Sequence, residues 1–214
     1  MARCITRDAS VFLVDEPFAN LDQALREKYR VNLRALLRQF NITTVYVTHD
    51  HHEALVLAHL LAVMNRGTIE QIGTPRDIYD RPKNLFVAGF LNVHAGTPPL
   101  SLVDPHGMPG VEGNVWVGVR PEDVGISREA KADRFRGTLT DVVDLPLGTT
   151  RLVTVRVADR DVYVATPADE SAAIGATVWL AFKRYHVFDK ESGLRLRSHA
   201  AANQRSSQTS CMRP

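Results

Sequence analysis

The segment that most constrains the fold is residues 11–17, which read VFLVDEP. Four apolar residues predict a short buried strand, and the proline ends it. The strand therefore stops at two adjacent carboxylates, Asp15 and Glu16. Such a strand end suits a nucleotide site, because Asp15 can orient a hydrated Mg²⁺ and Glu16 can polarise an attacking water.

A second strand with a polar end follows one helix-length later. Apolar residues recur at spacings of three and four over residues 23–40, which predicts an amphipathic helix with Asp22 as its N-cap. The β-branched and aromatic run 43–47 predicts the next strand. His49 follows that strand and can reach the γ-phosphate of a nucleotide bound at the first strand end.

The pattern of alternating strands and helices continues to about residue 91. A short helix is expected over 52–58, a strand over 60–64, and a hairpin turn at Asn65-Arg66-Gly67 leading into a strand over 68–72. Thr74 is expected to cap a further helix that begins at Pro75. Strands that alternate with helices indicate an α/β domain with a parallel sheet.

The second half of the chain has a different character. Short strands are predicted over 115–119, 135–143, 152–157, 162–165 and 177–182, with Gly148 and Gly175 in the turns between them. This half is therefore expected to be a small all-β barrel or sandwich. We place the domains at 1–92 and 93–197, and we expect the polar residues 198–214 to be a disordered tail.

These motifs, in this order, resemble the ATP-binding subunit of ABC transporters: a Walker B strand, a catalytic glutamate, a D-loop and an H-loop. Residues 73–92 are similar to the end of the ATPase domain in the carbohydrate-importer branch. Residues 117–122, VGVRPE, resemble the entry to that branch's TOBE domain, and the likeness continues to about residue 196. The resemblance implies an α/β fold, with part of a P-loop NTPase domain followed by a small OB-like TOBE barrel.

The resemblance also implies roles for single residues. Asp15 would be the magnesium-side carboxylate, acting on the metal indirectly, and Glu16 would be the general base of ATP hydrolysis. His49 would be the switch histidine. The D-loop, which communicates with the nucleotide and the partner subunit, would be formed by Asn20, Leu21 and Asp22.

Two motifs of that family are absent from the sequence. No G-x-x-x-x-G-K-[ST] loop occurs, and the Leu-Ser-Gly-Gly-Gln signature is missing. The P-loop supplies the backbone N–H groups and the lysine that hold the phosphates. ATP and Mg²⁺ are thus implied for the complete family member, whereas this chain alone is expected to bind neither and to be inactive. It resembles the C-terminal part of such a subunit.

The leading interpretation is a fragment of the ATP-hydrolysing subunit of an importer for sugars or sugar phosphates. One alternative is a non-catalytic regulatory or ligand-binding module. Another is half of a split ATPase that a separate P-loop-bearing chain completes. By resemblance, the partners would be transmembrane permease subunits and a second ATPase subunit.

The resemblance implies a peripheral protein on the inner face of the cell membrane, and the composition does not contradict this. The net charge of +2 gives no reason to expect nucleic-acid binding. The sequence has no signal peptide and no apolar run long enough to cross a bilayer, so the resemblance implies a cytoplasmic location held by the permease subunits.

Residues 49–53, HDHHE, allow a different interpretation, because three imidazoles and two carboxylates are common zinc ligands. A metallohydrolase would need further ligands from distant loops. No other histidine has a spacing that pairs it with this cluster, and the family resemblance already assigns His49.

The missing P-loop strand has a structural consequence. In the family's sheet it lies between the switch-histidine strand and the strand predicted at 60–64. Its absence would leave two sheet edges and apolar faces open. We therefore expect residues 1–92 to be poorly stable alone and residues 93–197 to fold independently.

Overall fold

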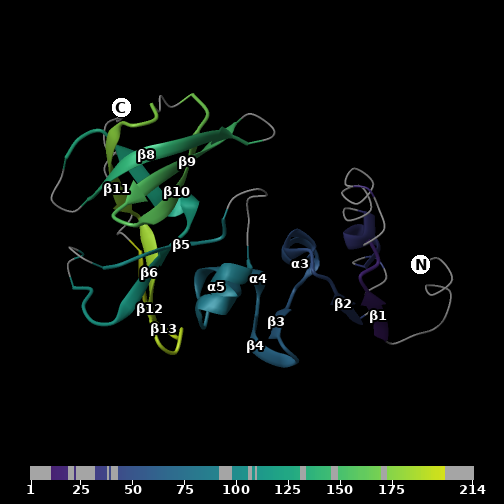
Figure 1. Ribbon diagram of the computed structural model, residues 1–214. Helices are drawn as coiled ribbons and strands as arrows, with labels where there is room; N and C mark the ends of the chain where they lie inside the picture. Colours follow the sequence, from purple (N-terminus) through teal and green to yellow (C-terminus); the bar gives the residue numbers. More distant parts are fainter. Residues whose placement is uncertain are drawn as a thin grey trace, which may run out of the picture. The chain divides into compact units, whose positions relative to one another are not determined.

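The computed structural model describes residues 11–18, 22, 32–37, 39, 43–91, 98–105, 108, 110–130, 134–145, 149–169 and 173–200. The chain divides into two compact units, residues 1–80 and 81–214, and each is described by itself (Figure 1). The packing units meet at Asp80 and Arg81, whereas the proposed domain boundary lies near residue 92. Residues 81–91 pack with the second unit.

The first unit has an α/β pattern that largely follows the sequence. Its described elements are β1 (Val11–Asp15), β2 (Thr43–Val47), α3 (His51–Leu57), β3 (Leu61–Asn65), β4 (Thr68–Gly73) and α4 (Pro75–Asp80). Residues 32–37 and 39 are helical, within the amphipathic helix predicted over 23–40. The remainder of that helix and Gly148 lie outside the described residues.

The strands of this unit form two separate pairs. β1 and β2 are parallel, from Val11 opposite Thr43 to Asp15 opposite Val47. β3 and β4 form an antiparallel hairpin whose turn residues Arg66 and Gly67 have φ of 47° and 81°. This combination of positive φ angles is what a two-residue hairpin turn requires. Among the described strands, neither pair hydrogen-bonds to the other, so a single continuous parallel sheet is not observed.

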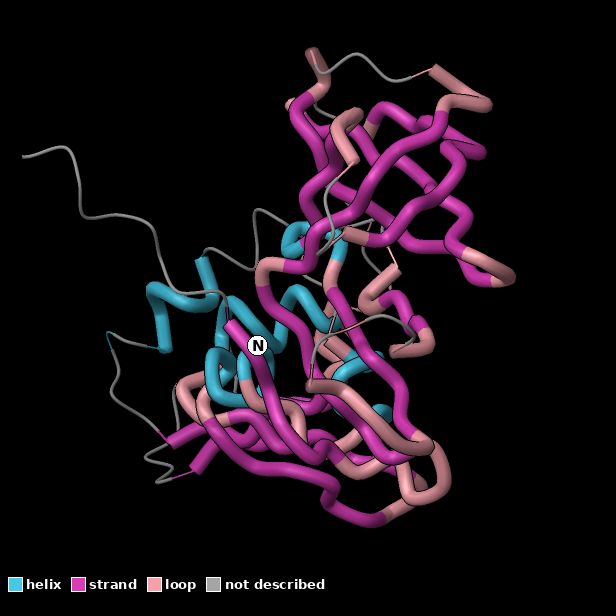
Figure 2. Tube along the Cα trace, turned by 90° about the vertical axis from the view of Figure 1, so that its left-hand side faces the viewer, coloured by secondary structure: helices cyan, strands magenta, loops and turns pink. Residues whose placement is uncertain are grey.

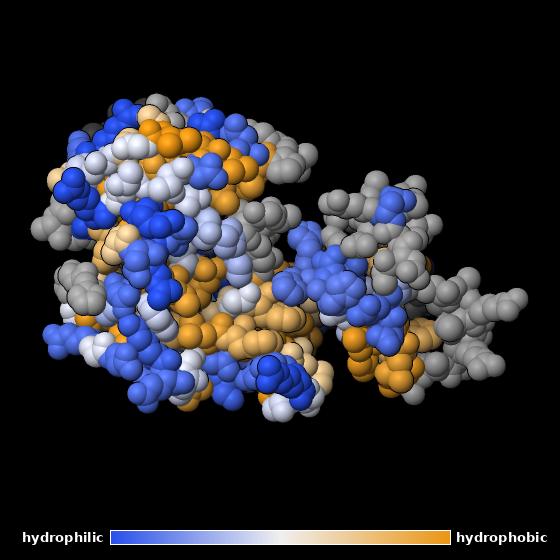
Figure 3. Space-filling model, in the orientation of Figure 1, coloured by the Kyte–Doolittle hydropathy of each residue, from blue (hydrophilic) through white to orange (hydrophobic). Residues whose placement is uncertain are grey.

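One face of the β1–β2 pair is open. Phe12, Val14 and Tyr46 are half-buried, while the alternate positions face outward. The outward apolar side chains and their exposed fractions are Val11 47%, Leu13 79%, Val45 50% and Val47 52%. Leu13 lies opposite Val45 in the register, so these side chains share one face. Figure 3 shows apolar surface over this part of the chain.

The second unit is built mainly of antiparallel strands (Figure 2). Its elements are α5 (Leu85–Phe90), β5 (Ser101–Val103), β6 (Val115–Val119), η1 (Pro121–Asp123), β7 (Val124–Ser127), β8 (Phe135–Asp144), β9 (Thr150–Val157), β10 (Arg160–Pro167), β11 (Thr177–Phe182), β12 (Arg184–Asp189) and β13 (Arg195–Ala200). One sheet has the order β10-β9-β8-β11-β7, and the other has the order β13-β12-β6-β5. The predicted all-β character of this half is confirmed.

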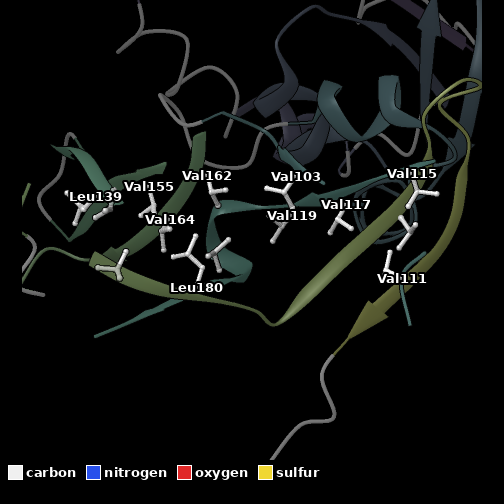
Figure 4. Packing of buried hydrophobic residues seen from close by; sticks show 14 residues of the cluster. Val103, Val111, Val115, Val117, Val119, Leu139, Val155, Val162, Val164 and Leu180 are labelled. Atoms are coloured by element: carbon white, nitrogen blue, oxygen red, sulfur yellow. The ribbon is translucent and has the colours of Figure 1, made fainter. Parts of the chain in front are cut away.

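The two sheets share one hydrophobic core. Its fully buried members include Val117 and Val119 of β6, Val155 of β9 and Leu180 of β11. Figure 4 shows these valine and leucine side chains as a continuous row that both sheets contribute to. Most of them are β-branched, which suits packing on a pleated surface.

The beginning of this unit is joined to its last hairpin. Leu85 N–H donates to the Gly193 carbonyl at 2.8 Å, and Arg195 N–H donates to the Lys83 carbonyl at 2.9 Å. Arg195 Nε also donates to the Pro82 carbonyl at 2.7 Å. β13 continues to Ala200, so residues 198–200 are part of a strand and not of the predicted disordered tail. Residues 201–214 lie outside the described part of the chain.

Candidate active site

The candidate site begins where β1 ends. Asp15 is the last residue of β1 and is exposed, and Glu16 follows it with φ of 39°. A non-glycine residue in this left-handed region is uncommon and costs about 1–2 kcal/mol. The Glu16 N–H donates to the Val47 carbonyl at 2.9 Å, which ties this corner to the end of β2. The turn therefore directs the two successive carboxylates beyond the sheet edge.

His49 meets Glu16 at that edge. Its Nδ1 lies 2.9 Å from Glu16 Oε1, and the exposed fractions of the two side chains are 70% and 44%. Because β1 and β2 are parallel, their carboxyl ends lie together, as the sequence analysis expected. This exposed pair contributes little to stability, so its geometry is of interest mainly for chemistry.

The other predicted site residues are placed less completely. Asp15 lies beside Glu16 at the strand end, and Asp22 is exposed. Asn20 and Leu21 lie outside the described residues, so the predicted D-loop stays a prediction. The structure thus brings together Asp15, Glu16 and His49 of the six residues.

The histidine-rich segment 49–53 folds into a helix start. The Asp50 side chain caps α3 by accepting from the His52 and Glu53 N–H groups at 2.9 and 3.0 Å. The Glu53 side chain points to other partners inside the unit. Within the described ranges, no group of three histidine, cysteine or acidic side chains is placed to hold a metal ion, and so no observation favours the zinc interpretation.

The hydrogen bonds of two polar residues next to the site, Thr48 and Glu53, were not predicted from the sequence. Glu53 is 3% exposed, and its Oε2 accepts from Tyr46 OH at 2.8 Å and from Thr48 Oγ1 at 2.9 Å. Thr48 Oγ1 also accepts from the Asp50 N–H at 2.9 Å. The D-x-x-E spacing of Asp50 and Glu53 resembles a capping box, in which the glutamate would return to the cap residue's N–H. Here Thr48 takes that N–H, and the carboxylate is free to bind the hydroxyls.

Burial also perturbs one imidazole of this segment. Desolvation lowers the pKa of His51 below its ordinary value of 6.5. Asp50 opposes that shift and His49 adds to it. His51 therefore favours its neutral form in the folded chain.

The second unit has its own charged cluster. The Trp116 ring lies between two cations, with Arg160 Cζ 4.3 Å and Lys190 Nζ 4.0 Å from its centroid. Lys190 also pairs with Asp104. Both contacts are favourable cation–π interactions. Trp116 lies in β6, a segment that the sequence predicted to be a strand.

A second polar contact lies at the start of β7. Arg184 Nε donates to Asp123 Oδ1 at 2.8 Å. Burial raises the pKa of Asp123, and the Arg184 hydrogen bond opposes that shift. The contact joins η1 to β12.

Comparison with known proteins identifies both parts of the chain. Residues 117–188 match the TOBE domain family. The chain is 38% identical over 217 residues to the sn-glycerol-3-phosphate import ATP-binding protein of Jannaschia sp., an alignment that covers 92% of this chain and 59% of the relative. The chain is homologous to part of the ATP-binding subunits of ABC importers. The family resemblance seen in the sequence is thereby confirmed.

Two further relatives show the breadth of this family. The sn-glycerol-3-phosphate import ATP-binding protein of Salmonella typhimurium is 36% identical, with 92% of this chain and 60% of the relative aligned. The trehalose/maltose import ATP-binding protein of Thermococcus litoralis is 34% identical, with 90% and 59% aligned. The chain thus spans 59–60% of the length of these relatives. In the part of the chain that the structure describes, no helix has the length and apolar character needed to span a bilayer.

Proposed function

We propose that this chain is the part of an ATP-hydrolysing importer subunit that carries the general base and the switch histidine. The observation that carries the proposal is the 2.9 Å contact between Glu16 Oε1 and His49 Nδ1 at the ends of two paired parallel strands. Ligands of open α/β sheets bind outside the carboxyl ends of the strands, which is where these side chains lie.

The residues at this edge fit a magnesium–nucleotide site. Asp15 and Glu16 are exposed carboxylates at one strand end, and carboxylates are ligands that suit hydrated Mg²⁺. ATP with Mg²⁺ would supply the phosphoryl group and its charge neutralisation. Asp15 would hold the metal side through a water, Glu16 would accept a proton from the attacking water, and His49 would fix the Glu16 carboxylate while facing the transferred group. The D-loop role of Asn20, Leu21 and Asp22 belongs to the same proposal.

This chain alone is proposed to be inactive, because its sequence has no phosphate-binding loop. The test is to measure Mg²⁺-dependent ATP binding and hydrolysis by the purified chain, its Glu16→Gln variant and a matched Glu112→Gln control in the β unit. We expect no binding or turnover from any of the three. Turnover by the chain that is lost in Glu16→Gln and kept in Glu112→Gln would contradict this part of the proposal.

The assigned roles are tested by restoring the missing motifs. The P-loop and signature segment of the Jannaschia relative would be produced together with this chain, and ATP hydrolysis would be measured. We expect activity with the Glu112→Gln control and a loss of at least about 100-fold with Glu16→Gln, which is the size of a general-base contribution. Equal activity of the two variants would exclude Glu16 as the base.

A split ATPase is the first alternative, and the open sheet supports it. Among the described strands β2 pairs only with β1, and the apolar face that includes Leu13 and Val45 is exposed. A strand from a separate P-loop-bearing chain would cover that edge and face. Copurification of this chain with such a segment, in a fixed ratio and with a raised melting temperature, would favour it.

A regulatory or ligand-binding module is the second alternative. The β unit has its own continuous core and therefore the means to act without ATP. Thermal-shift titration of the whole chain with sugars and sugar phosphates, in the absence of ATP, tests this alternative. Saturable stabilisation by one solute would favour a ligand-binding module.

The proposal for the complete subunit covers transport and location. The relatives' names specify import of sn-glycerol 3-phosphate or of trehalose and maltose, and a sugar or sugar phosphate is therefore the proposed solute class. Permease subunits and a second ATPase subunit are the proposed partners. They would hold the subunit at the inner face of the cell membrane.

A further inference from the structure

The buried carboxylate of Glu53 has no part in the roles described so far. Glutamate is seldom this deeply buried, and at 3% exposure it needs hydrogen bonds to offset its lost hydration. Both donors, Tyr46 OH and Thr48 Oγ1, reach the same oxygen, Oε2. Both also come from β2 or from the residue directly after it. Glu53 therefore binds α3 to the end of the strand that leads to His49.

The bonds continue from Glu53 to both sides of His49. Thr48, the residue before His49, donates its hydroxyl to Glu53 and accepts the Asp50 N–H at 2.9 Å. Asp50, the residue after His49, accepts the N–H groups of His52 and Glu53. The backbone on either side of His49 is thus fixed by one closed set of hydrogen bonds. The His49 side chain itself is 70% exposed.

An apolar residue could fill the same space, and exchanging a buried charge for an apolar side chain often leaves stability unchanged or improved. Such an exchange would, however, leave the Tyr46 and Thr48 hydroxyls without their acceptor. A glutamate at this position is therefore better explained by the geometry it imposes than by the stability it adds.

We propose that Glu53 is a positioning residue that holds the β2–α3 corner so that His49 Nδ1 faces Glu16 Oε1. The functional meaning of this inference rests on the proposed role of His49. The geometric claim, that Glu53 sets the orientation of His49 toward Glu16, concerns this chain alone and can be tested without nucleotide.

The readout is the tautomer of the His49 ring. A carboxylate only accepts hydrogen bonds, so the 2.9 Å contact with Glu16 requires the proton on Nδ1. Ring-nitrogen NMR of the full chain at about pH 8, above the ordinary histidine range of about 6.5, distinguishes the two neutral tautomers. A His49→Gln spectrum assigns the signal among the eight histidines.

Three variants separate positioning from general loosening. Glu53→Leu removes the acceptor, and we expect loss of the Nδ1-protonated signal of His49. Glu53→Gln keeps a carbonyl oxygen with two lone pairs, and we expect it to retain the signal. Val63→Ala, at a position 1% exposed in β3 of the same unit, removes packing at a residue outside the β2–α3 corner, and it should also retain the signal.

If Glu53→Leu does not fold, Thr48→Val provides the test of positioning. It removes the hydroxyl that joins Glu53 to the Asp50 N–H and leaves the Tyr46 bond in place, so loss of the His49 signal is expected. An unchanged signal in folded Glu53→Leu or folded Thr48→Val would overturn the inference. A wild-type His49 without the Nδ1 proton would overturn it as well, because the contact to be positioned would not exist.

Failure of the proposed function has a different signature. If the complemented chain shows no ATP hydrolysis while His49 keeps its Nδ1 proton in a Glu53-dependent way, the proposed function fails and the positioning inference stands. If ATP hydrolysis depends on Glu16 but the His49 signal does not change with Glu53, the proposed function stands and the positioning inference fails.

Discussion

His51 couples the stability of the first unit to pH. Burial lowers its pKa below 6.5 in the folded chain, so the unfolded chain binds this proton more readily. The stabilisation from His51 is therefore present above pH 6.5. It is lost as the pH falls through the lowered pKa of the folded state.

A His51→Gln variant should lose less stability on acidification than the wild type. We would measure the urea midpoint of each at about pH 7.5 and about pH 5.5, on either side of the ordinary histidine pKa of about 6.5. His52→Gln, at the neighbouring exposed position, is the matched control and should behave like the wild type. Equal acid sensitivity of His51→Gln and the wild type would contradict this assignment.

The residues of the candidate site were predictable to different degrees. Glu16 and His49 follow the ends of neighbouring parallel strands, and this topology was predicted from the spacing of the two apolar runs. Glu53 was not predictable, because a glutamate in the first turn of a helix ordinarily faces solvent or the cap. Its burial depends on Tyr46 and Thr48, which only the folded corner places beside it.

At the scale of elements, close approach between β8 and β9 explains one glycine. An alanine Cβ at Gly137 would lie 2.5 Å from Val155 Cγ1 and 2.9 Å from the Arg156 carbonyl oxygen. The oxygen belongs to the backbone and cannot move aside cheaply. A residue with a Cβ atom does not fit at position 137, because the neighbouring strand β9 occupies that space.

Gly137→Ala should destabilise the chain by about 1–3 kcal/mol, the usual cost of overpacking. Gly125→Ala is the matched control, since its Cβ would meet the Ala181 carbonyl and Lys183 Cε at an ordinary 3.7 Å. We expect the control to change stability by about 0.5 kcal/mol or less. The stabilities of both variants are compared by chemical denaturation. Similar denaturation midpoints would contradict the prediction and would show that β9 shifts to make room for the added Cβ atom.

The strands that were predicted are apolar runs bounded by turn residues, and length did not separate them from the strands that were missed. β6 and β11 have the predicted limits, 115–119 and 177–182. β5, β7, β12 and β13 were missed. β5 has only three residues, and its strand character comes from pairing with β6 and not from its own pattern. The separation of β2 from β3 agrees with the expected gap between these strands, an expectation that rested on the family resemblance.

At the scale of the whole molecule, the exposed apolar face of β1–β2 is the clearest site for unwanted association with other chains. Leu13 is 79% exposed and lies opposite Val45 on a two-stranded sheet. A two-stranded sheet with an apolar face and free edges favours association with other chains. The exposed side chains add little to the stability of the isolated chain, because they are not removed from water.

Leu13→Lys should reduce self-association and leave the free energy of unfolding within about 0.5 kcal/mol of the wild type. The measurement is sedimentation velocity over a range of concentrations, with chemical denaturation of the same samples. Ile174→Lys, at an exposed position of the β unit, is the control and should leave association unchanged. If the wild type and Leu13→Lys self-associate equally, the exposed face of β1–β2 does not mediate the association.

The joining of Pro82 and Lys83 to Arg195 has a consequence for synthesis on the ribosome. Pro82 and Arg195 are 113 residues apart, and elongation proceeds at about 5–20 residues per second. The start of the β unit therefore waits about 6–23 seconds for Arg195 to be translated. During that interval Leu85, the first residue of α5, lacks the Gly193 carbonyl to which its N–H group donates. The carbonyl groups of Pro82 and Lys83 therefore meet Arg195 only after residue 195 has been translated.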